Sequence, residues 1–150
     1  MAAALCGDRG VQLTPLRQRI LELLWNAERP SGAYDLVEAL RNDGDRPVGP
    51  PTIYRALDFL KAQGLVSKIE SRNSYVPCAH PERSHNCLFV ICSHCGASDE
   101  LEDARVEHLL AENAQAIGYR LERSVVEVQG ICEECIASGA SSATPEFRHD

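Results

Sequence analysis

Residues Tyr75–Gly96 read Tyr-Val-Pro-Cys-Ala-His-Pro-Glu-Arg-Ser-His-Asn-Cys-Leu-Phe-Val-Ile-Cys-Ser-His-Cys-Gly. Seven cysteines and histidines, all ligands that suit a soft or borderline metal ion, lie within eighteen positions of this stretch. The sequence before the stretch has helical periodicity, and the sequence after it has the pattern of a small α/β unit. We therefore expect the stretch to join two domains and to bind metal.

The length and composition of the chain limit its class. Its 150 residues suffice for one domain of usual size or for two small ones. No apolar run approaches the roughly 20 residues that span a bilayer, and the N-terminus lacks the features of a secretory signal. The seven cysteines are therefore expected to be thiols or metal ligands in the cytoplasm rather than disulfides.

The net charge of −7 is unevenly distributed along the chain. Residues 1–78 hold ten basic and nine acidic side chains, whereas residues 79–150 hold five basic and thirteen acidic ones. The first half is therefore nearly neutral, and it is the half in which contact with phosphates is expected.

Three helices are predicted in the first half. Thr14 followed by Pro15 is typical of a helix start, and Ser31 is the predicted cap of the second helix. The third helix lies in Pro50-Pro-Thr-Ile-Tyr-Arg-Ala-Leu-Asp-Phe-Leu60. Its expected core stripe, with spacing i, i+3, i+4 and i+7, is Ile53, Ala56, Leu57 and Leu60.

The polar side of the third helix carries side chains that suit contact with DNA. Thr52, Tyr54 and Arg55 lie in its first turn, the part of a recognition helix that reaches bases and phosphates. Two β-prone runs around residues 71–74 then predict a hairpin, in which Lys68 and Arg72 could contact phosphates. Three helices and a hairpin form a winged helix-turn-helix; the alternative is a three-helix domain with a solvated polar face.

Two C-x2-C knuckles are the most specific signal in the second half. Cys92 and Cys95 form one knuckle, Cys132 and Cys135 form the other, and together they predict a closed tetrahedral zinc site. A predicted strand, a helix over residues 104–117 and a second strand separate the knuckles. The alternatives are buried free thiols or a redox pair. A closed four-thiolate site has no open position for activated water, so we predict no enzyme activity.

A second metal site is suggested by the remaining ligand residues. Cys78, His85 and Glu100 would provide one sulfur, one nitrogen and one oxygen, a set that favours Zn²⁺. A metal ion bound by these residues would join the two halves of the chain. The alternative is that they are scattered polar residues.

The third helix, the segment Asn73-Ser-Tyr-Val-Pro-Cys78 and the paired knuckles resemble the ferric uptake regulator family, in particular its zinc-sensing branch. The similarity extends from about Leu13 to Cys135. Such proteins are dimeric bacterial repressors that bind palindromic operator DNA when a regulatory zinc is bound, and they silence genes for zinc import. The resemblance thus implies a zinc-responsive repressor with no small-molecule substrate and no membrane association.

The resemblance also assigns roles to particular residues. It implies two Zn²⁺ per subunit: a structural ion at the four knuckle cysteines and a regulatory ion at Cys78, His85 and Glu100. It further implies DNA contacts by Tyr54 and Arg55 and a phosphate contact by Tyr34. Zinc-sensing relatives usually supply a fourth regulatory ligand at the position of Ser67. Serine is a poor zinc ligand, so either His80 or water takes that role, or the site binds zinc more weakly; His80 is the expected replacement.

The expected fold is therefore α+β. Residues 1–77 are predicted to form a winged-helix DNA-binding domain, 78–87 a hinge with metal ligands, 88–136 a small α/β dimerisation and zinc domain, and 137–150 a disordered tail. Within the family, an iron- or peroxide-responsive regulator is the alternative. Outside it, the alternatives are a thiol-based redox regulator using Cys6, Cys78 and Cys87, and an acidic adaptor without a DNA role.

Overall fold

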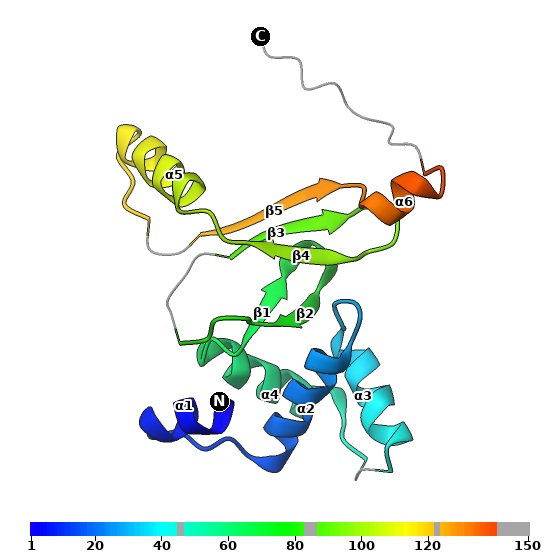
Figure 1. Ribbon diagram of the computed structural model, residues 1–150. Coiled ribbons are helices and arrows are strands. Elements are labelled where there is room, and N and C mark those ends of the chain that lie inside the picture. The colour runs from blue at the N-terminus through cyan, green and yellow to red at the C-terminus, as the bar shows by residue number, and fades with distance from the viewer. Residues whose placement is uncertain (45–46, 83–86, 122–123, 141–150) are drawn as a thin grey trace. The chain divides into compact units, whose positions relative to one another are not determined.

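A computed structural model describes residues 1–44, 47–82, 87–121 and 124–140 (Figure 1). The chain forms two compact units, Met1–Asn86 and Cys87–Asp150. Each unit combines helices with its own sheet, which confirms the predicted α+β class. Within the described ranges, every helix is too short or too polar to span a membrane.

The first unit consists of helices followed by a β-hairpin. Its elements are α1 (Ala2–Asp8), α2 (Pro15–Asn26), α3 (Ala33–Asn42), α4 (Pro50–Ala62), β1 (Val66–Ile69), the short 3₁₀ helix η1 (Glu70–Arg72) and β2 (Ser74–Pro77). Strands β1 and β2 are antiparallel, with Lys68 opposite Tyr75. Asn73 makes the turn between them in the left-handed region, at φ +48°, a conformation that asparagine tolerates better than most residues. This hairpin is the predicted wing.

The predicted helix starts were right for α2 and wrong for α3. The Thr14 hydroxyl accepts a hydrogen bond from the Arg17 backbone N–H at 3.4 Å, as an N-cap should. Helix α3 is instead capped at Gly32, whose N–H donates to the Asp35 carboxylate at 2.7 Å. Ser31 lies outside the helix because its backbone N–H and C=O both pair with Tyr75.

The second unit contains a three-stranded sheet and two helices within its described residues. Its elements are β3 (Cys87–Cys92), β4 (Ser98–Leu101), α5 (Ala104–Ala116), β5 (Val125–Gly130) and α6 (Glu133–Ala137). The strand order is β4-β3-β5, with β3 antiparallel to β4 and parallel to β5. The predicted strand, helix and strand correspond to β3, α5 and β5, whereas β4 was not predicted.

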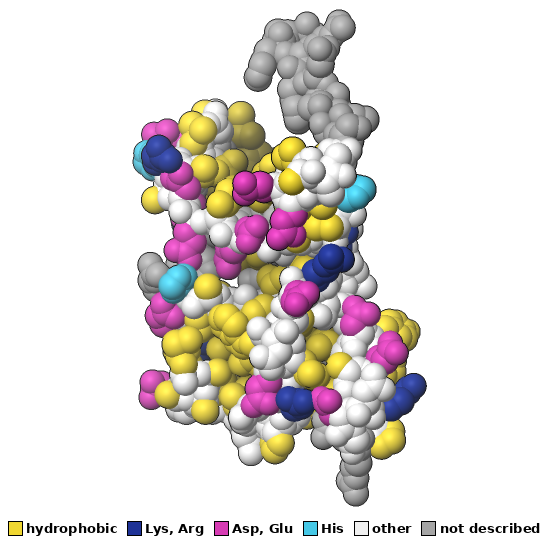
Figure 2. All heavy atoms as spheres, turned by 45° about the vertical axis from the view of Figure 1, so that its right-hand side comes forward, with side chains coloured by type: hydrophobic (Ala, Val, Ile, Leu, Met, Phe, Trp, Pro, Cys, Tyr) yellow, Lys and Arg dark blue, Asp and Glu magenta, His cyan; other side chains and the backbone are white. Residues whose placement is uncertain are grey.

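Helix α5 is largely exposed. It has no buried residue and makes only slight contact with any other described element. The side chains of Leu109 and Ile117 are 59% and 74% exposed. Figure 2 shows hydrophobic side chains at the surface of this unit, interspersed with acidic ones. The apolar stripe of α5 is therefore not buried by any of the residues that the structure describes.

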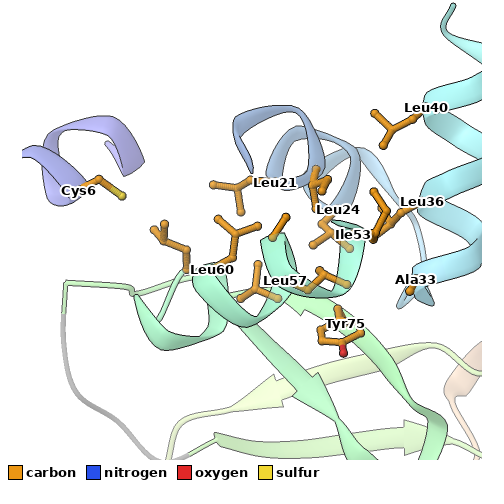
Figure 3. Packing of buried hydrophobic residues seen from close by; sticks show 14 residues of the cluster. Cys6, Leu21, Leu24, Ala33, Leu36, Leu40, Ile53, Leu57, Leu60 and Tyr75 are labelled. Atoms are coloured by element: carbon orange, nitrogen blue, oxygen red, sulfur yellow. The ribbon is translucent and has the colours of Figure 1, made fainter. Parts of the chain in front are cut away.

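The first unit, in contrast, has a closed hydrophobic core (Figure 3). Helices α1 to α4, β1 and β2 contribute to it, and Ile53, Ala56, Leu57 and Leu60 are all buried, which confirms the predicted stripe. Burying a leucine or isoleucine side chain stabilises a fold by about 1.5–3 kcal/mol. Helix α1 was not predicted; Cys6, which is 1% exposed, packs it against this core.

Candidate functional site

The sheet of the second unit brings the two cysteine knuckles to one place. In the parallel pairing of β3 with β5, Cys92 lies opposite Gly130, two residues before Cys132. The backbone N–H of Ser93 donates to the Gly130 carbonyl at 2.8 Å and fixes this end of the pairing. Cys132 is the N-cap residue of α6, and Cys135 lies within that helix. Cys95 and Cys132, which are 37 positions apart in sequence, therefore become neighbours.

The four thiols form a cluster with the dimensions of a zinc site. The sulfur atoms of Cys92, Cys95, Cys132 and Cys135 all lie within 4.8 Å of one another, and no disulfide joins them. The Cys95 and Cys132 sulfurs are 3.7 Å apart. Sulfurs bound tetrahedrally at about 2.3 Å from one ion are about 3.8 Å apart. The donor set and its spacing thus fit Zn²⁺.

Backbone N–H groups point at one of these sulfurs. The Cys92 Sγ accepts hydrogen bonds from the N–H groups of Cys95 and Cys132, at 3.5 and 3.4 Å. Gly96, at φ +80°, closes the turn by donating to the Cys92 carbonyl. Sequence reasoning predicted the ligands but not these donors, because any residue type supplies a backbone N–H.

The same contacts set the acidity of the thiols. The two backbone N–H donors lower the pKa of Cys92 to about 5. The hydrogen bond with Cys132, together with burial, raises the pKa of Cys135 to about 12. Thiolates crowded together repel one another, so they do not all ionise without a cation among them. A bound divalent cation would allow all four to become thiolates.

The residues predicted for the second metal site are divided between the two units. Cys78 directly follows β2 and is buried, and its N–H donates to the Leu65 carbonyl at 3.0 Å. His80 is half-buried, with its Nδ1 3.3 Å from a Glu82 carboxylate oxygen. Glu100 lies in β4 of the second unit, opposite Phe89. His85 lies outside the described residues, so this ligand set stays a prediction.

Ser67 lies in β1 opposite Val76. It occupies the position at which relatives are expected to supply a fourth ligand. Its side chain is largely buried, at 9% exposure. Because a serine hydroxyl is a poor zinc ligand, Ser67 is not expected to bind the ion of the predicted site.

The recognition helix presents the predicted polar residues at its start. Gly49 is the N-cap of α4, and Pro50 occupies the first turn, where its missing N–H costs nothing. Thr52 and Arg55 are exposed in the first turns of α4. Tyr54 is half-buried against the core of the unit. Thr52 and Arg55 are therefore accessible to a ligand from solution.

The other predicted DNA contacts lie on α3 and the wing. Tyr34, in the first turn of α3, is 70% exposed, although tyrosine usually buries its ring. On the wing, the Lys68 ammonium is 2.9 Å from a Glu70 carboxylate oxygen, and this contact raises the pKa of Lys68. Arg72 is exposed in η1.

A winged helix-turn-helix followed by an α/β unit with four clustered thiols defines a class of metal-binding transcription regulators. Residues 8–129 match the ferric uptake regulator family, and the chain belongs to this family.

Similar proteins of known structure or function cover nearly the whole chain. The zinc uptake regulation protein of Escherichia coli (strain K12) is 38% identical over 150 residues, which are 99% of this chain and 87% of that protein. A zinc uptake regulator complexed with zinc and DNA has a TM-score of 0.86 at 39% identity and covers 93% of both chains. The crystal structure of holo XcZur has a TM-score of 0.81 at 41% identity, covering 91% of this chain and 94% of the other.

Proposed function

We propose that this protein is a zinc-responsive, DNA-binding transcriptional repressor of zinc-uptake genes. The similarity over 93% of both chains to a zinc uptake regulator bound to zinc and DNA carries the proposal. The relatives described above, at 38 to 41% identity, include a zinc uptake regulation protein and a zinc uptake regulator bound to zinc and DNA, which disfavours an iron- or peroxide-responsive role. A repressor of this kind acts on the chromosome, in the cytoplasm, and needs no enzyme activity.

One zinc ion would be structural. Cys92, Cys95, Cys132 and Cys135 would hold it, and the ion would fasten the end of β3 to the start of α6. Four protein ligands leave no open coordination position, so this ion would stabilise the fold rather than activate water. A unit with few buried side chains gains most from such an ion.

A second zinc ion would be regulatory. Cys78, His85 and Glu100 would hold it, with His80 as the candidate for the fourth ligand. Cys78, His80 and His85 lie in the segment 78–87 and Glu100 follows it in the sequence. We propose this segment as the hinge between a DNA-binding domain (1–77) and a dimerisation and zinc domain (88–136). The proposed disordered tail, 137–150, lies mostly outside the described residues.

Operator DNA would meet the first unit. Arg55 could donate two N–H hydrogen bonds from its guanidinium to a guanine edge. Thr52, Tyr54 and Tyr34 could contact bases or phosphates from α4 and α3. Lys68 and Arg72 of the wing would add phosphate contacts. For Lys68 this requires sharing its ammonium with Glu70, which now pairs with it.

Zinc would act as a corepressor by shifting a conformational equilibrium. Two chains would associate through the exposed apolar side chains of the second unit, and two-fold symmetry would match a palindromic operator. The regulatory ion would select the arrangement of the two winged units that fits successive major grooves. Zinc and DNA would then strengthen each other's binding.

The test measures operator binding by fluorescence anisotropy at controlled concentrations of free zinc. The bound zinc is measured by elemental analysis. Cys78→Ser is expected to lose zinc-dependent operator binding and one zinc per chain, while the structural zinc and the dimer remain. Cys87→Ser is the matched control and should behave as wild type. Normal operator binding by Cys78→Ser at moderate zinc would show that the proposed regulatory site is wrong.

Two other classes are separated by the same assay. A thiol-based redox regulator would release DNA on addition of peroxide at constant free zinc. An adaptor without a DNA role would show no salt-dependent DNA binding at any zinc concentration. We expect steep salt dependence together with release by zinc removal alone.

A further inference from the structure

Arg9 connects two separate segments of the first unit through one guanidinium group. Its Nη1 donates to the Gln63 carbonyl, at the C-cap of the recognition helix α4. Its Nη2 donates to the Pro81 carbonyl at 3.1 Å. These partners are 54 and 72 positions away in sequence. Arginine suits this task because its donors are fixed in a planar fork, whereas lysine has a single nitrogen.

The end of helix α1 holds Arg9 in place. Val11 N–H donates to the Cys6 carbonyl at 2.9 Å, and Gly10 N–H donates to the Gly7 carbonyl at 3.0 Å. These two bonds, with Gly10 at φ +66°, form a Schellman motif. Because Cys6 is also buried in the core, the backbone of Arg9 starts from a fixed position.

Pro81 lies in the segment that carries the proposed regulatory ligands. It follows Cys78 and His80, and it precedes His85. Cys78 and Pro81 line a groove of about 300 Å³ together with residues of α1 and α2. In this segment the Cys78 backbone is fixed by Leu65 and the Pro81 backbone by Arg9. Hydrogen bonds thus hold the backbone of the segment Cys78–Pro81 at both of its ends.

We propose that Arg9 is a positioning residue for the regulatory zinc site. It would order the segment Cys78–Glu82 against the end of the recognition helix before zinc binds, so that less conformational entropy is lost on binding. This inference rests on the proposed regulatory role of Cys78. Arg9 is neither one of the proposed zinc ligands nor one of the proposed DNA contacts.

The test measures two properties of the full-length protein besides operator binding. The affinity for the second zinc is obtained by competition with a chelator after the first site is filled. Hydrogen exchange of the Ala79, His80 and Glu82 amides is measured before the second zinc is added. Arg9→Gln should weaken the second zinc about fivefold and accelerate exchange at these amides, because a partly exposed charged hydrogen bond is lost.

Two further variants control for charge and for folding. Arg29→Gln removes the same charge from an exposed position of the same unit and should change neither property. Arg9→Lys keeps the charge at the end of α1 but reaches one carbonyl, so it should weaken the second zinc by about twofold. Unchanged zinc affinity and unchanged exchange in both Arg9 variants would overturn the inference, as would an equal effect of Arg29→Gln.

Failure of the regulatory site itself gives a different result. If Cys78→Ser retained two zinc ions per chain, the proposed site would be wrong, whatever Arg9 does. If Cys78→Ser lost the second zinc while the Arg9 variants kept wild-type affinity, only the role of Arg9 would be wrong.

Discussion

The two units of the chain satisfy their hydrophobic side chains in different ways. In the first unit, Leu57 and Leu60 of α4 are completely buried, and the helices and wing close one core. In the second unit, α5 buries no residue, and Leu109 and Ile117 face solvent. The first unit is thus a self-contained domain by its own packing. The second leaves the apolar side chains of α5 exposed and brings four thiols together, so we expect a metal ion and a partner chain to stabilise it.

The largest expected effect comes from removing the structural zinc. Cys95→Ser should unfold the second unit, because structural zinc binding contributes about 10–16 kcal/mol in small zinc domains and this unit has little core to replace it. The first unit should keep its fold. Hydrogen exchange followed unit by unit measures this, with Cys87→Ser as the control thiol. If the amides of the second unit stayed protected from exchange in Cys95→Ser, the second unit would not need the zinc ion to fold, and the proposed difference between the two units would be wrong.

A core mutation in the first unit should have the next largest effect. Leu57→Ala removes a side chain with 0% exposure and should destabilise that unit by about 2–5 kcal/mol through lost burial and a cavity. Denaturant unfolding monitored in the first unit gives the value. Protection of the second unit should not change, and a parallel loss there would show that the units do not fold independently.

Leu109→Ala tests the opposite behaviour on α5. Because this side chain is 59% exposed in the single chain, the change should alter the stability of an isolated chain by no more than about 0.5 kcal/mol. It should weaken dimerisation by about 1–3 kcal/mol if α5 lies in the dimer interface. Analytical ultracentrifugation over a dilution series measures this. An unchanged dimer constant would exclude Leu109 from the interface.

The smallest expected effect is electrostatic. Hydrogen bonds from the Arg105 side chain and backbone lower the pKa of Asp103, the N-cap of α5, from 3.8 to about 2. The pair therefore stabilises α5 above about pH 4, and this stabilisation is lost as the pH falls towards 2. Arg105→Gln should raise the pKa of Asp103 towards 3.8, which a carboxyl NMR titration measures. An unchanged pKa would show that the pair does not form.

The sequence predicted what depends on local pattern or on specific chemistry. The stripe of α4, the Thr14 cap and the C-x2-C knuckles all follow from spacing and residue type. The prediction that Ser31 caps α3 was wrong because its backbone pairs with Tyr75, and this tertiary pairing overrides the capping preference of serine. Strand β4 was missed because Ser98-Asp-Glu-Leu101 has little β propensity and forms a strand only through its pairing with β3.

Two further features could not be predicted from pattern alone. The apolar stripe of α5 has the spacing of a core-facing helix, and periodicity does not distinguish a core from a subunit interface. No sequence motif predicts the contacts of Arg9, because every residue type has a backbone carbonyl that could accept its hydrogen bonds. For the regulatory site, the residue types suggested Cys78, His85 and Glu100, while Ser67 leaves its fourth ligand to be identified.

The central claim is that regulatory zinc and operator DNA are thermodynamically coupled. The most direct measurement is the affinity for the second zinc with and without saturating operator, alongside the operator affinity with and without that zinc. Linkage requires both ratios to be the same. We predict that operator DNA tightens zinc binding by the same factor as zinc tightens operator binding, about 10-fold or more. A second zinc whose affinity is unaffected by operator DNA would contradict the account.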